Sequence, residues 1–148
     1  MSKGNDGVWL QDELAKALKA FCERTPACFH RFQDTKAARG FLPAQPGDYF
    51  WLVPGASVLI ECKSTDRSAP LERLLEPGQC GKHRLWHRAG HPSAFVYGDR
   101  ASGALRWHAG RSVLGPKGRE APVPMWEGRT GQCLEMLLHV ATKVAVNL

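Results

Sequence analysis

The chain has 148 residues, 43% of them hydrophobic, and carries 20 Lys and Arg against 14 Asp and Glu, a formal net charge of +6. This length and composition are typical of one globular domain spanning residues 1–148 and exclude an intrinsically disordered chain, while the basic surplus favours a polyanionic partner such as nucleic acid. Five cysteines without paired spacing, a polar N-terminus and no apolar run of about 20 residues argue against a secreted, disulfide-rich or membrane protein, so we expect a cytoplasmic one, in the host cytoplasm if it is viral.

The first expected element is a helix from about Val8 to Glu23, capped by Asn5 or Asp6. Its apolar residues recur at helical spacing and form one face: Leu10, Leu14, Ala17, Leu18 and Phe21. Glu13 lies on the flank of this face, from which its carboxylate can reach over a neighbouring sheet. The alternative is an ordinary solvated carboxylate.

A short strand is expected at residues 27–32, followed by a long polar segment that contains two prolines. Arg31, Lys36 and Arg39 belong to this region and are candidates for contacts with DNA phosphates. The alternative is a solvated loop without a binding role.

The segment Gly47–Thr65 predicts a β-hairpin, with strands at residues 48–53 and 57–63 and a turn at Pro54-Gly55. Side chains alternate along a strand, so Glu61 and Lys63 share one face while Cys62 points away. A two-residue loop places Asp48 directly opposite Glu61, and a four-residue loop makes them diagonal neighbours. Both registers bring Asp48, Glu61 and Lys63 together, whereas an odd-numbered loop separates them.

Two carboxylates at contact distance repel each other unless a proton or a cation lies between them. Hard oxygen ligands at a partly open site suit Mg²⁺, with Mn²⁺ as an alternative. A lysine beside such an ion can position or activate a water molecule, so the hairpin favours metal-assisted phosphodiester hydrolysis. The alternative is a structural ion pair at a solvent-facing strand end.

A short helical piece is expected at residues 70–75 and a longer helix from Pro77 to about Ala89, which Gly90 ends. Four residues of the longer helix lie three or four positions apart and share a face: Gln79, Lys82, His83 and Trp86. The same region contains Cys80, His83, His87 and His91, a spacing that favours a competing hypothesis, a zinc site.

Two strands, at residues 93–97 and 104–109, are expected to form a second hairpin. Residues 110–124 are rich in Gly and Pro and predict a basic loop carrying Arg111, Lys117 and Arg119. A last helix is expected from about Thr130 to Val146, with five residues facing inward: Leu134, Leu137, Leu138, Ala141 and Val144.

Gly47-Asp48 and Glu61-Cys62-Lys63, with Glu61 thirteen positions after Asp48, resemble the motif of the PD-(D/E)XK nuclease superfamily. The resemblance covers about residues 8–97. Within the superfamily, the chain is most similar to Holliday-junction resolvases and to VRR-NUC nucleases. The family's Pro-Asp pair is interrupted here by Gly47. The resemblance implies an α/β, restriction-endonuclease-like fold with an αβββαβ core, a central mixed sheet flanked by helices.

The resemblance also implies roles for individual residues. Asp48, Glu61 and the backbone carbonyl of Cys62 would bind the metal, and Lys63 would position the attacking water. Gln79, and Glu13 from the first helix, would lie at the metal site. The segment before Asp48, with Arg31, Asp34 and Thr35, resembles the basic segment of the resolvases.

The implied function is a Mg²⁺-dependent endodeoxyribonuclease that leaves a 5′-phosphate and acts on branched, junction or duplex DNA in recombination, repair or phage DNA processing, as a homodimer. The alternatives are a nuclease for flaps or single strands, a restriction-type enzyme, a non-cleaving nucleic-acid-binding module of the same fold, and a zinc-stabilised interaction domain. The expected DNA contacts are Arg31, Lys36, Arg39, Lys82, His83, Arg111, Lys117 and Arg119.

Overall fold

The computed structural model describes residues 8–32, 47–114 and 123–144. Its elements, in chain order, are α1 (Val8–Arg24), β1 (Cys28–Arg31), β2 (Tyr49–Val53), β3 (Ala56–Thr65), α2 (Leu71–Leu74), α3 (Pro77–Arg88), β4 (Ser93–Asp99), β5 (Ala104–Ala109), α4 (Gly110–Val113), β6 (Trp126–Arg129) and α5 (Cys133–Val144). The succession α1, β1, β2, β3, α3, β4 contains the predicted αβββαβ core, so the expected fold class is confirmed.

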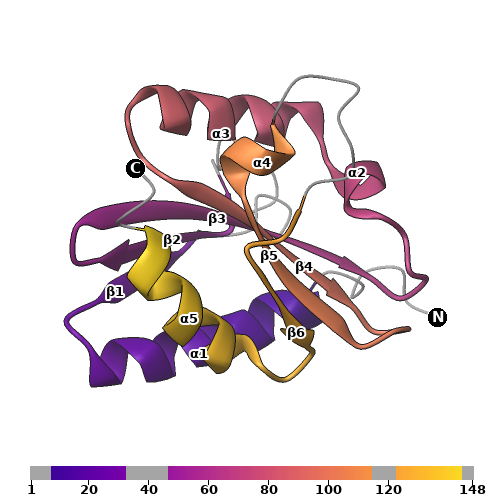
Figure 1. The fold of residues 1–148 in the computed structure, drawn as a ribbon, viewed down its shortest axis with the longest axis horizontal. Coiled ribbons are helices and arrows are strands. Elements are labelled where there is room, and N and C mark those ends of the chain that lie inside the picture. Colours follow the sequence, from indigo (N-terminus) through magenta and orange to yellow (C-terminus); the bar gives the residue numbers. More distant parts are fainter. Residues whose placement is uncertain (1–7, 33–46, 115–122, 145–148) are drawn as a thin grey trace.

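The six strands of the described ranges belong to one mixed sheet with the order β1-β2-β3-β4-β5-β6 (Figure 1). Among the described strands, β3 and β4 pair in parallel and the other neighbouring pairs are antiparallel. A parallel pair needs a crossover connection, which α2 and α3 supply on one face of the sheet. The ends of β2 and β3 that carry the predicted motif therefore lie beneath α3.

A two-residue turn joins β2 to β3, because Val53 pairs with Ala56. Proline restrains φ at the first turn position, and Gly55 has φ of 85°, the left-handed value that a type II turn requires at its second position. The regular ladder ends with Tyr49 opposite Ile60. This is the two-residue register predicted from the sequence, and it places Asp48 beside Glu61.

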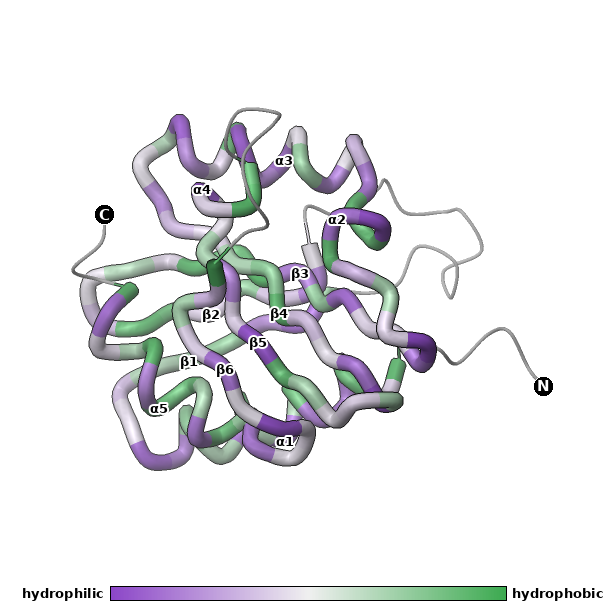
Figure 2. Tube along the Cα trace, turned by 45° about the vertical axis from the view of Figure 1, so that its right-hand side comes forward, coloured by the Kyte–Doolittle hydropathy of each residue, from purple (hydrophilic) through white to green (hydrophobic). Residues whose placement is uncertain are grey.

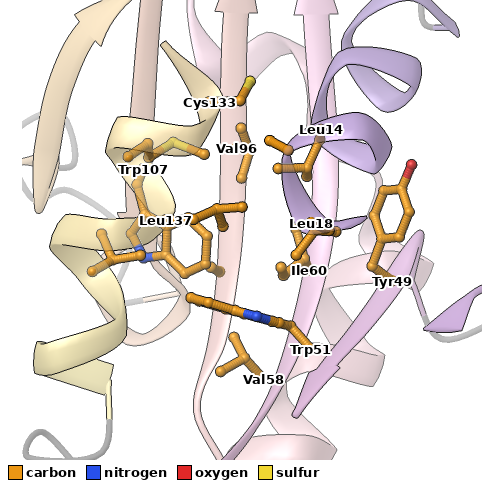
Figure 3. Close-up of a cluster of buried hydrophobic side chains, with 14 of the residues drawn as sticks. Leu14, Leu18, Tyr49, Trp51, Val58, Ile60, Val96, Trp107, Cys133 and Leu137 are labelled. Atoms are coloured by element: carbon orange, nitrogen blue, oxygen red, sulfur yellow. The ribbon is translucent and has the colours of Figure 1, made fainter. Parts of the chain in front are cut away.

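The main hydrophobic core lies between the sheet and the pair α1 and α5, on the face opposite α3 (Figures 1 and 3). Alternate residues of β2 point into it, so that Tyr49, Trp51 and Val53 are buried. The Trp51 ring packs edge-on against Phe21 at 5.2 Å and against Trp107 at 5.9 Å between centroids. Figure 3 shows how side chains of α1, α5 and the strands fill this layer.

A smaller buried cluster lies on the other face, where α2, α3 and α4 cover the sheet (Figure 1). Leu71 of α2 and Cys80 of α3 pack there against Phe95 and Tyr97 of β4. All seven residues of β4 are buried, as expected for a strand that is covered on both faces. By contrast, α3 is mostly hydrophilic along its length (Figure 2), so its outer side faces solvent.

The C-terminal third differs from the sequence-based expectation. Residues 110–113 form the short helix α4, and Trp126–Arg129 forms β6, an edge strand that the sequence analysis missed. The last helix begins at Cys133, and Leu138, predicted to face inward, is 48% exposed. Across the three described ranges, no helix is long and apolar enough to cross a membrane.

Candidate active site

Four polar side chains meet on the α3 face of the sheet, where β2 begins and β3 ends. Glu61 and Lys63 alternate with Cys62 on β3, so both point toward α3 while the Cys62 side chain lies in the main core. Gln79 comes from the first turn of α3, and Asp48 from the residue preceding β2. Glu61 and Lys63 are only 3% and 8% exposed, so this is a desolvated cluster of charged groups.

Asp48 is held by the backbone of the neighbouring strand. Its own N–H donates to the Ile60 carbonyl at 2.8 Å, and its Oδ2 accepts the Cys62 N–H at 2.7 Å. The carboxylate thus takes the place of a strand carbonyl where the β2 ladder stops. Its Oδ1 accepts a longer hydrogen bond, 3.3 Å, from Nε2 of Gln11. The orientation of Asp48 is therefore set by three separate partners.

Gln79 joins Glu61 to Lys63. Its Nε2 donates to Oε1 of Glu61 at 2.8 Å, and its Oε1 accepts a hydrogen bond from the Lys63 ammonium. Lys63 Nζ also lies 3.7 Å from Oε1 of Glu61. The two acceptors, Gln79 and Glu61, compensate the burial of the Lys63 ammonium. Gln79 thus lies beside the motif, as the sequence analysis predicted.

The two carboxyl groups influence each other's protonation. Burial, followed by the charge of Asp48, raises the pKa of Glu61 to about 8. Burial also raises the pKa of Asp48, against the opposing effects of the Cys62 N–H and the Lys63 charge. A hydrogen bond between the two side chains raises the pKa of Glu61 and lowers that of Asp48, so Glu61 is the carboxyl group that takes up a proton more readily. Replacing that proton with a cation would allow both groups to ionise.

The donor set fits a hard divalent cation. Asp48 and Glu61 supply carboxylate oxygens that would repel each other when both are ionised, and Mg²⁺ commonly takes one or two carboxylates and keeps several waters. Nowhere in residues 8–32, 47–114 and 123–144 do three or more His, Cys, Asp or Glu side chains group as a metal site. The pair thus suits Mg²⁺ or Mn²⁺ better than an ion that needs a complete protein cage.

The helix residue at this site is Gln11, not the predicted Glu13. Gln11 donates to Asp48, and its Oε1 accepts a hydrogen bond from Arg31 at 3.3 Å. Glu13 lies near Cys133 of α5, whose pKa is raised to about 12 by burial and by the Glu13 charge. Residues two apart on a helix are about 200° apart around its axis, so Gln11 and Glu13 flank the apolar stripe on opposite sides. The sequence signal that could have identified Gln11 is its place on the other flank.

The zinc hypothesis is not supported by the structure, because its four residues do not come together as a metal site among the described residues. Cys80 belongs to the small buried cluster, and the His83 ring stacks on Phe95 at 4.3 Å. The predicted DNA contact through His83 is also wrong, since this residue is fully buried. Burial lowers the pKa of His83 to about 4, further aided by the His87 and Lys63 charges.

The other expected DNA contacts have different positions. Arg31 is an exposed side chain that also forms a 3.0 Å ion pair with Asp12. Arg111 is exposed on α4, and Lys82 is partly exposed on α3. Four further candidates lie outside the described residues: Lys36, Arg39, Lys117 and Arg119. Binding of DNA by Arg31, Lys82 and Arg111 stays a prediction.

No protein-family model and no curated protein matches this sequence. Among solved structures, the chain is similar to Hjc, described as a Holliday junction resolvase from the archaeal hyperthermophile Archaeoglobus fulgidus, with a TM-score of 0.49. This match covers 89% of the chain and 93% of Hjc at 15% sequence identity. The function of the chain is therefore inferred from the geometry of its own site.

Proposed function

We propose that this protein is a Mg²⁺-dependent endonuclease that hydrolyses phosphodiester bonds in DNA. One observation carries the proposal: Asp48, Glu61 and Lys63 converge on one face of the β2–β3 hairpin, as two neighbouring carboxyl groups beside a buried ammonium. A module that only binds a polyanion has no use for two desolvated carboxyl groups next to it, because they repel phosphate. The pair makes chemical sense when a cation neutralises it.

Asp48 and Glu61 are the residues that would hold the metal, with the Cys62 carbonyl as a further ligand. When bound, Mg²⁺ would supply electrostatic stabilisation of the negative charge that grows on the phosphate. The Cys62 N–H and Gln11 keep Asp48 in place, so the ligand is preorganised. Lys63, oriented by Gln79 and Glu61, can donate to the attacking water or to a phosphate oxygen.

DNA is the favoured substrate because the chain is basic and carries exposed Arg side chains on the helices that cover the site's face of the sheet. Arg84 and Arg88 are exposed on α3, the helix that also carries Gln79, and Arg111 is exposed on α4. Arginine suits bidentate contact with phosphates without base readout. We infer structure-selective cutting of branched DNA by a homodimer, with a 5′-phosphate product.

The test compares four labelled DNAs: linear duplex, single strand, flap and four-way junction, each with Mg²⁺, with Mn²⁺ and with EDTA. The variants are Asp48→Asn, Glu61→Gln and Lys63→Met, which keep side-chain size while removing one charge each. The control is Asp66→Asn, which removes the charge of an exposed carboxylate three residues after Lys63. We expect metal-dependent cutting by the native chain and by the Asp66 variant, and a loss of at least about a hundredfold in the other three.

Binding measured in EDTA distinguishes the alternatives. A chain that binds DNA but cuts none of the four substrates with either metal would be a non-cleaving module. Cutting that survives Asp48→Asn and Glu61→Gln would place the activity elsewhere or in a contaminant. Both results would overturn the proposal, whereas retained binding with lost cutting in the three site variants supports it.

A further inference from the structure

A row of aromatic rings lies on the α3 face of the sheet, beside the Asp48–Glu61 pair. Consecutive rings in the row are 4.8–5.6 Å apart between centroids. The row runs from β1 through β2 to α3 and the residues after it, and its members are His30, Phe32, Phe50, Trp86 and His91. We call this set the aromatic row.

The aromatic row shares a face with the active site. Phe50 follows Asp48 by two residues, so both side chains point to the same side of β2, away from Tyr49 and Trp51. Phe32 donates its backbone N–H to the Asp48 carbonyl at 2.9 Å. Two residues along a strand span about 7 Å, which matches about two base steps of a DNA strand at about 3.4 Å each.

The aromatic row is not part of the hydrophobic core. Among the described residues, none of its rings belongs to either buried cluster or to the side chains packed against them. Phe32, Phe50 and Trp86 are partly exposed, and the histidines at the two ends are exposed. Trp86 donates its Nε1–H to the Ser57 carbonyl at 3.2 Å, and its ring stacks on that of Phe50 with 29° between the planes. The rings of the aromatic row are thus accessible to solvent, and the hydrogen bond of Trp86 fixes one of them in place.

We propose that the aromatic row stacks the base of an unpaired nucleotide adjacent to the phosphate that is cut. This inference rests on the proposed function, in which Asp48, Glu61 and Lys63 hold that phosphate. Aromatic rings bind any base through its π-face without reading its sequence, and the basic side chains of α3 provide contacts for the flanking phosphates. The substrate class is therefore DNA with unpaired bases at the cut, as at a flap, a single-stranded end or an opened branch point.

The test measures binding in EDTA, so that it is independent of cutting. Two fluorescent DNAs of the same length are compared, one a continuous duplex and one with three unpaired nucleotides at a duplex end. Phe50→Leu removes a ring of the row. The matched control is Phe29→Leu, the same change on neighbouring β1, at a ring on the opposite face beside Tyr49. We expect Phe50→Leu to weaken binding of the DNA with unpaired bases by about tenfold and that of the duplex by less than about twofold.

A second readout uses the DNA itself as the probe. The fluorescent base analogue 2-aminopurine, placed at the unpaired position, is quenched when it stacks on an aromatic ring. We expect the native chain to quench it and His30→Ala, at an exposed end of the row, to reduce the quenching. Melting temperatures of all variants verify that each one folds.

Three results would overturn the inference: equal losses in Phe50→Leu and Phe29→Leu, no quenching by the native chain, or a native chain that binds both DNAs equally. Self-association that Phe50→Leu abolishes in the absence of DNA would instead assign the row to contact between two copies. These results leave the metal-dependent cutting assay unaffected. Conversely, a chain that discriminates the two DNAs but never cuts would contradict the nuclease proposal while retaining the stacking site.

Discussion

The backbone N–H of Cys62 donates a 2.7 Å hydrogen bond to Oδ2 of Asp48, so the middle residue of the Glu61-Cys62-Lys63 triplet holds the carboxylate of the neighbouring strand. Cys62 thereby takes part both in the site on the α3 face and in the core on the opposite face of the sheet. Its side chain packs in the main core, and burial raises the pKa of its thiol well above the usual value, aided by the two carboxylates. The site is consequently tied to the main hydrophobic core through the backbone and side chain of one residue.

The first prediction concerns stability against pH in the absence of metal. Glu61 has its pKa raised to about 8 in the folded chain, so between about pH 4.5 and 8 the folded state holds a proton that the unfolded state has lost. Stability contributed by this proton is present below pH 4.5 and is lost as the pH rises through 8. We expect the free energy of unfolding in urea with EDTA to fall by on the order of 5 kcal/mol across that window. Glu61→Gln should flatten the slope, and an unchanged slope in that variant would contradict the assignment.

The second prediction follows for metal binding. A cation must displace the shared proton of Asp48 and Glu61, so metal affinity should rise with pH up to about 8. We expect Mn²⁺ to raise the melting temperature more at pH 8.5 than at pH 6. Asp48→Asn should abolish the effect, whereas Asp66→Asn, an exposed carboxylate, should preserve it. A shift of equal size at both pH values would argue against this carboxyl pair as the ligand.

The third prediction concerns acid. Both ring nitrogens of His83 are buried and have no hydrogen-bond partner among the described residues, and burial lowers the pKa of His83 to about 4. Between about pH 6.5 and 4 the unfolded chain binds a proton that the folded chain does not, so His83 destabilises the fold as the pH falls through this window. Compared with the native chain, His83→Phe should reduce the pH dependence there by about 1.4 kcal/mol per pH unit. The pKa of His108 is also lowered to about 4, chiefly by burial, so the part of the pH dependence of stability that His108 causes would remain in this variant.

The fourth prediction compares the two flanks of α1. Gln11→Ala removes the Nε2 that donates to Asp48, and we expect cutting to fall by about tenfold with the melting temperature nearly unchanged. Glu13→Ala truncates a side chain that lies near Cys133 instead, so cutting should change by less than about twofold. Initial rates on the preferred DNA at saturating Mg²⁺ provide the measurement. A larger effect at Glu13 would reverse the assignment of the flanks.

The fifth prediction tests the orientation of α5. Leu137 is fully buried and its neighbour Leu138 is 48% exposed. Leu137→Ala should lower the free energy of unfolding by about 2–5 kcal/mol because it leaves a cavity. Leu138→Ala should change it by less than about 0.5 kcal/mol. The free energies of unfolding of both variants are measured in urea. Similar decreases in the two would mean that α5 is rotated about its axis relative to the orientation described here.

Much of the site could be derived from local rules. Pro54-Gly55 specifies a tight turn, a two-residue loop specifies the pairing of Val53 with Ala56, and strand alternation then places Glu61 and Lys63 on the side of Asp48. The limits of α1 and α3 and the position of Gln79 follow from helical periodicity and from a proline at the helix start. These features depend on residues close in sequence, or on a register that one turn decides.

Other features of the site and the fold could be seen only in the tertiary structure, because they depend on contacts between segments distant in the sequence. Periodicity places Gln11 and Glu13 on two flanks of one stripe, but only the direction in which α1 crosses the sheet determines that Gln11 meets Asp48. His83 shares a helix face with Gln79, yet it is buried because α3 packs it onto Phe95 of β4. Strand β6 is defined by its pairing with β5 and not by a pattern within its own four residues. Local pattern thus determined the hairpin that carries Asp48, Glu61 and Lys63, while long-range packing selected which neighbours complete the site, because packing free energy depends on the whole fold and not on any one segment.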